Sequence, residues 1–392
     1  MPSLLRLVLP ALAAVSTAYA ASCTVSATTT IQNAGDATGL ASCSTFSGSI
    51  AIATGTTDDI ALDGIKKLSG NLIATNNANM KRLSAANLET LDGEMRLDGL
   101  TRLYGVDFPK LKNIDSIKWN ALPNLQTIGF TAEVEQAKKL DIQNTGLRSL
   151  KGINIEEVKT LFIANNGYIN EFSMQLGNVS DSLTLADNNV NVKVELPNLI
   201  WATNLTFRFC GSVSVPSLKT LNGSLGLYNN GFESFSAPNL TSVGEALAIV
   251  ANDKLSNITF PMLTKITDNL QIANNSQLAE IQAFPELKSI GGAFDISGNE
   301  SKVETPKLES VKGAFNLQST DNITEACDFY KSLQQKKWLQ GKYFCRGKVE
   351  DPGTAGHTPK DQSGSSKKSA ATSLSAVNGA LGLAAMAAVL LL

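Results

Sequence analysis

Residues 285–299 read PELKSIGGAFDISGN, and this stretch holds one unit of the repeat that decides the fold. The unit opens on a Pro-x-Leu element at Pro285 and passes through a glycine pair. It closes on the pattern apolar, any residue, apolar, two residues, Asn, which places Phe294 and Ile296 before Asn299. Alternating apolar residues are typical of a strand with one buried side. Each unit therefore predicts one short strand, entered through a tight corner and left through a return turn.

The first apolar position of this pattern recurs every 20–24 residues: Ile50, Leu72, Met95, Ile117, Leu140, Leu161, Leu183, Leu205, Leu225, Leu247, Leu270, Phe294 and Phe315. Pro-x-Leu recurs with it at Pro109, Pro123, Pro197, Pro216, Pro238, Pro261, Pro285 and Pro306. A fixed period of this length indicates a solenoid. We expect an all-β, right-handed solenoid of about thirteen coils over residues 47–322, similar to leucine-rich repeats and, more closely, to the receptor L domain.

An amide or thiol side chain stands five residues after many of these marks, at Asn77, Asn166, Asn188, Cys210, Asn230, Asn252, Asn275 and Asn299. We expect these residues to form a buried ladder, because an inward Asn can hydrogen-bond backbone groups of neighbouring coils that would otherwise be unsatisfied. Cys210 could instead be a reactive thiol or form an intermolecular bridge. Its position in the repeat favours a buried ladder residue.

Two cysteine pairs flank the repeats and predict the caps that a solenoid needs at its ends. Cys23 and Cys43 precede the first coil, and Cys327 and Cys345 follow the last. In a secreted chain each pair should join locally and contribute about 3 kcal/mol. We expect an N-terminal cap over 21–46 and a C-terminal cap over 323–346, the latter with a helix at 324–338 that Thr324 caps.

The two ends of the chain read as targeting signals. Residues 1–20 hold one basic residue, an apolar run and the cleavage pattern Ala18-Tyr19-Ala20, which predicts a signal peptide. A membrane helix is the weaker alternative, since the run is too short to span a bilayer.

The other end predicts attachment of a GPI lipid. A cluster of small residues is followed by a polar spacer and then by an uncharged terminus that runs from Ala376 to Leu392. We place the attachment site at Gly364, with Ser363 or Ser365 as alternatives. Residues 365–392 would then be removed, residues 347–364 would be a flexible stalk, and the lipid would be the only contact with the membrane.

The composition excludes several classes of function. Lys and Arg number 33 against 35 Asp and Glu, so charge gives no reason to expect nucleic-acid binding. The single histidine, His357, lies in the polar tail, which rules out a Ser-His-Asp triad, a Cys-His dyad or a His-ligated zinc site in the repeats. We expect no cofactor.

Catalysis by paired carboxylates is also not expected. Outward Asp141 and Asp295 stand seven coils apart, or about 34 Å, whereas a glycosidase needs carboxylates about 5–9.5 Å apart. Asp58, Asp59 and Asp63, like the pair at 156–157, are interpreted as solvated turns. The sequence favours a protein that is not an enzyme.

Eight N-glycosylation sequons lie between residues 178 and 324, at Asn178, Asn204, Asn222, Asn239, Asn257, Asn274, Asn299 and Asn322. We expect a glycoprotein in which Asn299 is the doubtful site, because a buried ladder amide cannot carry a sugar. Residues 21–177, which hold no sequon, contain the candidate interaction face, an outward row of Ile73, Arg96, Lys118, Asp141 and Phe162. This row has few aromatic rings, which argues mildly against a lectin.

The signal peptide, cysteine pairs, coils such as residues 285–299 and GPI tail together resemble the fungal extracellular-mutant and sporulation-specific family of cell-wall proteins. The resemblance implies a fungal source, a location at the outer leaflet of the plasma membrane or in the wall, and a role in wall organisation and integrity. It implies no catalytic residue. We expect a scaffold or interaction platform whose partners are wall components or other wall proteins. The alternatives are a receptor-like module for a secreted peptide or protein and, less favoured, a glucan-remodelling enzyme.

Overall fold

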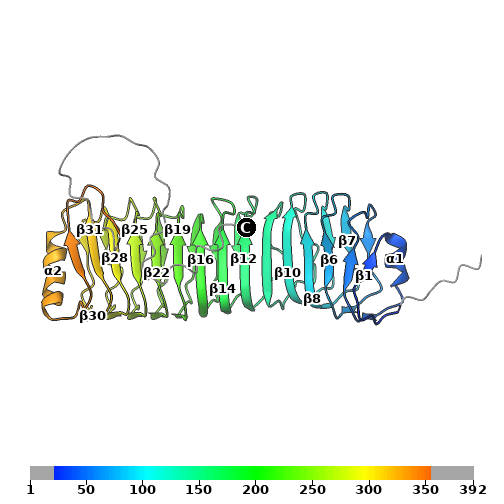
Figure 1. The fold of residues 1–392 in the computed structure, drawn as a ribbon, viewed down its shortest axis with the longest axis horizontal. Coiled ribbons are helices and arrows are strands. Elements are labelled where there is room, and N and C mark those ends of the chain that lie inside the picture. Colours follow the sequence, from blue (N-terminus) through cyan, green and yellow to red (C-terminus); the bar gives the residue numbers. More distant parts are fainter. Residues whose placement is uncertain (1–21, 355–392) are drawn as a thin grey trace, which may run out of the picture. The chain divides into compact units, whose positions relative to one another are not determined.

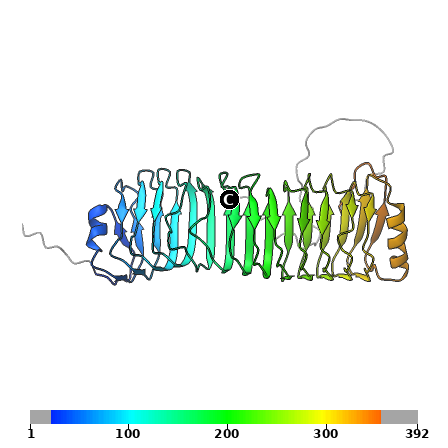
Figure 2. The same cartoon turned by 180° about the vertical axis from the view of Figure 1, so that it is seen from behind.

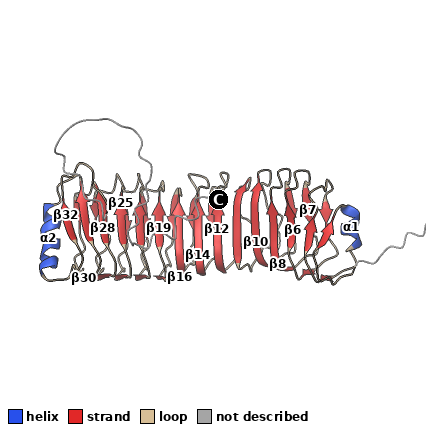
Figure 3. Cartoon of the chain, viewed as in Figure 1, coloured by secondary structure: helices blue, strands red, loops and turns tan. Residues whose placement is uncertain are grey.

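The computed structural model describes residues 22–354, and they form a solenoid of about thirteen parallel coils (Figure 1). Strands dominate, and one helix lies at each end of the stack (Figure 3). None of the described helices is long and apolar enough to cross a membrane. The predicted signal peptide (1–20), the attachment site at Gly364 and the propeptide (365–392) lie outside the described residues.

The main row of strands runs the length of the solenoid, and its members pair in parallel (Figures 1 and 2). They are β1 (Thr29–Ile31), β3 (Ile50–Ile52), β6 (Leu72–Thr75), β8 (Thr90–Asp98), β10 (Asn113–Leu122), β11 (Lys139–Thr145), β12 (Glu157–Ala164), β14 (Asn178–Ala186), β16 (Trp201–Arg208), β19 (Leu225–Tyr228), β22 (Leu247–Val250), β25 (Leu270–Ala273), β28 (Phe294–Gly298), β31 (Phe315–Ser319) and β32 (Tyr343–Arg346).

Shorter strands build the other sides of the coils. Before the main row come β2 (Thr45–Phe46), β5 (Lys67–Leu68), β18 (Thr220–Leu221), β21 (Ser242–Val243), β24 (Lys265–Ile266), β27 (Ser289–Ile290) and β30 (Ser310–Val311). After it come β4 (Ile60–Ala61), β7 (Arg82–Ser84), β9 (Gly105–Asp107), β13 (Glu171–Ser173), β15 (Lys193–Glu195), β17 (Ser212–Ser214), β20 (Ser234–Ser236), β23 (Asn257–Thr259), β26 (Glu280–Ile281) and β29 (Lys302–Val303).

The register of the main row confirms the predicted repeat. Every first apolar position pairs with that of the next coil, from Ile50 to Phe315. All of them are buried, as are the Leu residues of the Pro-x-Leu turns. The core is a column of apolar side chains inside the coils and includes stacked rings such as Phe260 and Phe284, whose centroids lie 5.3 Å apart. Because this core lies within the described range and is closed at both ends, residues 22–354 form a self-contained folding unit.

The corner glycines are required by the close approach of neighbouring coils. A Cβ at Gly70 would lie 2.3 Å from the carbonyl oxygen of Gly48, and one at Gly313 would lie 2.5 Å from the carbonyl carbon of Gly292. These contacts are far shorter than real Cβ atoms show, so only glycine fits there. Coils with such a corner turn sharply between two short strands.

Most predicted ladder residues are buried and joined from coil to coil. The Oδ1 atom of Asn252 accepts the backbone N–H of Asn230 at 2.9 Å, and the Oδ1 atom of Asn275 accepts that of Asn252 at 2.9 Å. Cys210 is buried with a free thiol, and its N–H donates to Asn230 Oδ1 at 2.9 Å. Asn77, Asn166 and Asn188 are buried in their coils as well. The residue before many ladder positions has a left-handed backbone, for example Asn229 with φ of 52°, which accounts for the frequent Asn-Asn pairs.

Asn299 does not belong to this buried ladder, so the prediction made for this residue is wrong. Its side chain is half-buried and donates to the carbonyl oxygen of Ser276 at 2.9 Å, whereas the side chain of Glu300 is fully buried. Strand β28 extends to Gly298, one residue further than the strands of the preceding coils, so the inward position falls one residue later. Burial therefore gives no reason to doubt the sequon at Asn299.

Disulfide-linked caps close both ends of the solenoid, as predicted. The bridge between Cys23 and Cys43 has a Cα–Cα distance of 5.5 Å, and that between Cys327 and Cys345 a distance of 5.6 Å. The N-terminal cap also contains the short helix α1 (Ala34–Gly39), which the sequence analysis did not predict.

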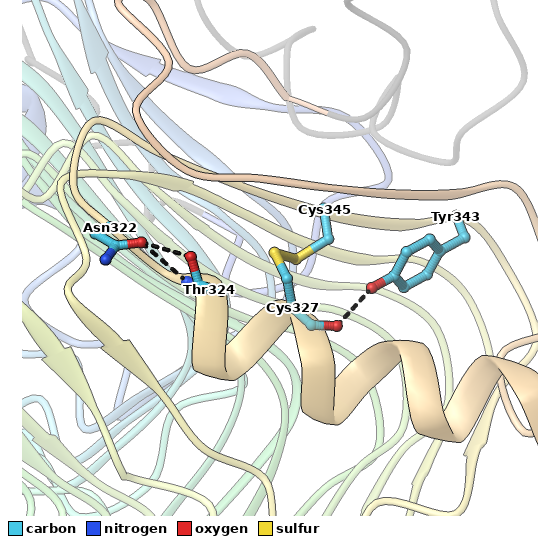
Figure 4. Close-up of a disulfide and its surroundings, with 5 residues drawn as sticks. All are labelled: Asn322, Thr324, Cys327, Tyr343 and Cys345. Carbon is cyan, nitrogen blue, oxygen red and sulfur yellow. Dashed lines mark hydrogen bonds between the residues drawn. A yellow bond between two sulfur atoms is a disulfide. The ribbon is translucent and has the colours of Figure 1, made fainter.

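The C-terminal cap is built on helix α2 (Thr324–Gln335), which covers the last rings of the core. Its Tyr330 lies 4.8 Å from the Phe315 ring. The expectation that Thr324 caps this helix is wrong. Asn322 Oδ1 accepts hydrogen bonds from Thr324 N at 3.3 Å and Oγ1 at 2.7 Å, while Tyr343 donates from its hydroxyl to the Cys327 carbonyl at 3.2 Å (Figure 4).

The prediction that residues 347–364 form a flexible stalk is wrong for the first of these residues. Residues 347–353 lie over the outer face of the last coils and are not free. The N–H of Val349 donates to the carbonyl oxygen of Ser319 at 3.0 Å, and the carbonyl oxygen of Gly353 accepts from the side chains of Asn316 and Gln318 at 2.9 and 2.8 Å. Those outward side chains are buried for this reason.

Candidate functional site

The predicted interaction face is one continuous row on the outside of the main sheet. Ile73, Arg96, Lys118, Asp141 and Phe162 pair in register across β6, β8, β10, β11 and β12. Among residues 22–354 no ion pair joins these side chains, and Asp141 accepts a hydrogen bond from Gln143 at 2.6 Å. These five side chains therefore form a row of successive positions on neighbouring strands.

A groove lies beside this face, where the long strands begin. It has a volume of about 1130 Å³ and crosses six consecutive coils, from β8 to β16. It is lined by residues 90–92, 113–115, Glu133, 135–138, Asn154, 156–159, Gln175, Asn178, Ser180 and Trp201. Six coils at about 4.8 Å each give a run of about 24 Å between the first and the last. We call this feature the polar groove.

Five of the six coils that line the polar groove lack a glycine at the corner, while the first, at β8, keeps Gly93. Two residues before the first apolar mark stand Asp115, Lys138, Lys159, Asp181 and Thr203, where other coils have glycine. In β8, β10, β12, β14 and β16 the strand passes through this corner unbroken, with register shifts such as the one between Val158 and Thr160, whereas β11 begins at Lys139, just after the corner. Bulges of this kind bend a strand and redirect its side chains. The replacement of glycine at five successive corners can be read from the sequence and could have located most of the groove.

Carboxylates dominate the charge of the polar groove. Lys67 pairs with Asp92 at 2.8 Å, Lys138 with Asp115 at 2.7 Å, and Lys112 with Glu135 at 3.3 Å. The hydrogen bond to Asp115 raises the pKa of the Lys138 ammonium above its ordinary value. Glu133 and Glu156 also line the groove, and among the described residues neither makes an ion pair. The groove thus presents an excess of hydrogen-bond acceptors.

Amide side chains and one aromatic ring complete the lining. Asn113 and Gln136 are neighbours on adjacent coils, and in the described part of the chain no hydrogen bond engages either side-chain amide. Asn178 donates to Glu157 Oε1 at 3.0 Å. Trp201 pairs in register with Asn178 and is only partly buried. The outward row used in the sequence analysis missed this ring, since Trp201 lies before the strand mark of its coil.

The positions of Glu135, Glu156 and Glu157 in the polar groove bear on whether the protein could be an enzyme. The solvated-turn interpretation of Glu156 and Glu157 was incomplete: Glu157 begins β12, and both residues line the polar groove together with Glu135 of the preceding coil. Carboxylates from neighbouring coils therefore do share one groove. All three are exposed to solvent, whereas enzymes usually exclude water from their reacting groups. Within residues 22–354 no group of His, Cys, Asp or Glu side chains is placed to hold a metal ion.

Most sequon asparagines lie at accessible positions. Asn222, Asn239, Asn257, Asn274 and Asn322 are exposed, while Asn178, Asn204 and Asn299 are half-buried. The side chain of Asn204 is tied to neighbouring coils: its Oδ1 accepts the Ser224 N–H at 2.9 Å, and its Nδ2 donates to the carbonyl oxygen of Asp181 at 3.3 Å. Asn178 is the sequon that lines the polar groove.

A disulfide-capped parallel solenoid with a long exposed face defines a leucine-rich-repeat-like surface protein of the receptor L-domain kind. Comparison with known proteins specifies it further. The family described as Ecm33, GPI-anchored cell wall organization protein, matches residues 3–41. Protein ecm33 of Aspergillus fumigatus is 40% identical over 352 residues, covering 89% of this chain and 87% of that protein.

Two further relatives carry related names. A cell surface GPI-anchored protein of Arthroderma benhamiae is 37% identical over 90% of each chain. Sporulation-specific protein 2 of Saccharomyces cerevisiae is 31% identical over 82% of this chain and 63% of its own. No solved structure gives a significant match. The chain belongs to the Ecm33 family of GPI-anchored cell wall organization proteins, and it is a fungal cell-surface protein of the wall.

Proposed function

We propose that this protein supports wall organisation as a non-enzymatic scaffold or interaction platform. The observation that carries the proposal is the uninterrupted exposed surface formed by the outer row and the polar groove, both of which cross many coils. Repeat solenoids use such extended surfaces for binding. Their rigidity here comes from the parallel pairing of every coil with the next.

Attachment and glycosylation belong to the same proposal. A GPI lipid at Gly364 would hold the solenoid at the outer leaflet of the plasma membrane, and exposed sequons such as Asn239 and Asn257 would carry glycans toward the wall. Wall polysaccharides or other wall proteins would be the partners. Several groove carboxylates are held in ion pairs with lysines, which favours a structural or binding role over general acid catalysis.

The test uses the secreted fragment 21–363, which contains the whole folding unit. The fragment is incubated with purified β-glucan, chitin and mannan and, separately, with an extract of wall proteins. Retention of a polysaccharide or of specific proteins, with no release of soluble sugar, is the expected result. Release of sugar would show an enzyme and overturn the proposal, as would the absence of retention in both experiments.

A variant in cells tests the outer row. Alanine at Ile73, Arg96 and Lys118 removes three neighbouring side chains of the candidate face without touching the core. If this face carries the interaction, the triple variant should reach the surface at normal levels and fail to restore wall integrity in cells that lack the protein. Normal wall integrity would exclude this row as the interaction face.

A further inference from the structure

The polar groove has the chemistry of a saccharide site. Its lining includes amides, carboxylates, two lysines (Lys138 and Lys159) and one indole ring. Amides donate and accept, and carboxylates accept, so together they can satisfy the hydroxyl groups of a sugar. A partly exposed indole such as that of Trp201 offers the flat apolar area on which a sugar ring packs. Asn113 and Gln136, which make no side-chain hydrogen bonds within residues 22–354, lie between the ends of the groove.

The spacing of the groove favours a sugar chain over a peptide. The lining repeats once per coil, at about 4.8 Å, in the direction along the solenoid. One β-linked hexose unit of an extended chain adds nearly this length, so successive units can meet side chains at equivalent positions of successive coils, such as Thr90, Asn113 and Gln136. An extended peptide rises about 3.3 Å per residue and drifts out of step with the coils.

We infer that the polar groove binds a linear, neutral, β-linked hexose polysaccharide that lies along the solenoid axis. This inference rests on the proposed function and names the ligand of the interaction platform. The chain would cross from Thr90 to Trp201, with its hydroxyl groups on Asn113, Gln136 and the carboxylates, and one ring on Trp201. The run of about 24 Å has room for about five units.

The sequon at Asn178 requires a specific control. A glycan on this residue would begin inside the groove and beside Trp201, its neighbour in register. The protein's own sugar could then occupy the place of the ligand. Replacing Asn178 with Gln removes the attachment point and keeps an amide that can donate to Glu157. All binding measurements therefore use both the natural fragment and the Asn178→Gln variant.

The experiment titrates fragment 21–363 with oligosaccharides of β-linked glucose, β-linked N-acetylglucosamine and mannose, in order of increasing length, by calorimetry. We expect one of the β-linked series to bind, with an affinity that rises up to about five units and then levels off. Trp201→Ala and Gln136→Ala, each in the Asn178→Gln background, should weaken binding by about tenfold. Tyr168→Ala is the matched control, because Tyr168 is exposed but lies outside the groove, and it should bind normally.

Distinct outcomes separate this inference from the broader proposal. Binding only by the Asn178→Gln fragment supports the site and shows that the natural glycan fills it. Absence of binding to every series, or binding that Trp201→Ala and Gln136→Ala leave unchanged, overturns it. Strong weakening of this binding at high salt also overturns it, because a neutral sugar makes no ion pairs with the groove that salt could screen. If no sugar binds but wall proteins are retained, this inference fails while the platform proposal survives.

Discussion

Glu300 makes the stability of the last coils depend on pH. Its carboxyl group is buried in the ladder, and neither oxygen has a hydrogen-bond partner in the described structure. Burial raises the pKa of this carboxyl from 4.5 to about 7. The folded protein therefore retains a proton between these values while the unfolded chain has lost it. Stability is full below pH 4.5 and falls as the pH rises through about 7.

The size of the effect follows from the same interval. One pKa unit corresponds to about 1.4 kcal/mol, so the range from 4.5 to about 7 amounts to about 3 kcal/mol at most. Glu300→Gln keeps the shape of the side chain and removes the titration. At mildly alkaline pH the variant should exceed the natural protein in free energy of unfolding by up to about 3 kcal/mol, and at acidic pH the two should be nearly equal.

We would measure the difference in free energy of unfolding between Glu300→Gln and the natural protein across the pH range. The two measurements are urea unfolding of fragment 21–363 and amide hydrogen exchange in β28 and β31. Glu309→Gln is the control, because it removes an exposed carboxylate near the same coils. It should not alter the pH dependence. A difference between Glu300→Gln and the natural protein that is the same at acidic and alkaline pH would refute the reasoning.

Three further predictions concern the ladder and the caps. Asn252→Ala should destabilise the solenoid by about 3 kcal/mol in urea unfolding, because the buried N–H of Asn230 loses its acceptor and a cavity remains; an effect below measurement error would contradict a structural ladder. Burial raises the pKa of the Cys210 thiol to about 12, so it should react with a thiol reagent only after unfolding, and rapid labelling of the native protein would show otherwise. Cys345→Ser should cost about 3 kcal/mol and speed hydrogen exchange in α2 while leaving exchange in β10 unchanged; equal loss in both elements would indicate that the cap does not act locally.

The repeat made most of the fold predictable from the sequence. Because side chains alternate strictly along a strand, the apolar marks from Ile50 to Phe315 defined both the inward side and the register of the main sheet. The cysteine pairs located the two caps for a similar reason, since a pair close in sequence at each end of a solenoid can close only locally. The family was recognisable from the same features.

Contacts between coils decided what the sequence left open. A single additional strand residue at Gly298 moved Glu300, rather than Asn299, into the ladder, and period alone cannot show where a strand ends. The segment that ends at Gly353 covers outward residues that local pattern marks as exposed. The polar groove arises where several adjacent coils bend without glycine, so that side chains such as Gln136 and Trp201, distant in sequence, come to line one surface. Alternation fixes the side of the sheet on which a residue lies, but only the stacking of the coils fixes which residues it meets there.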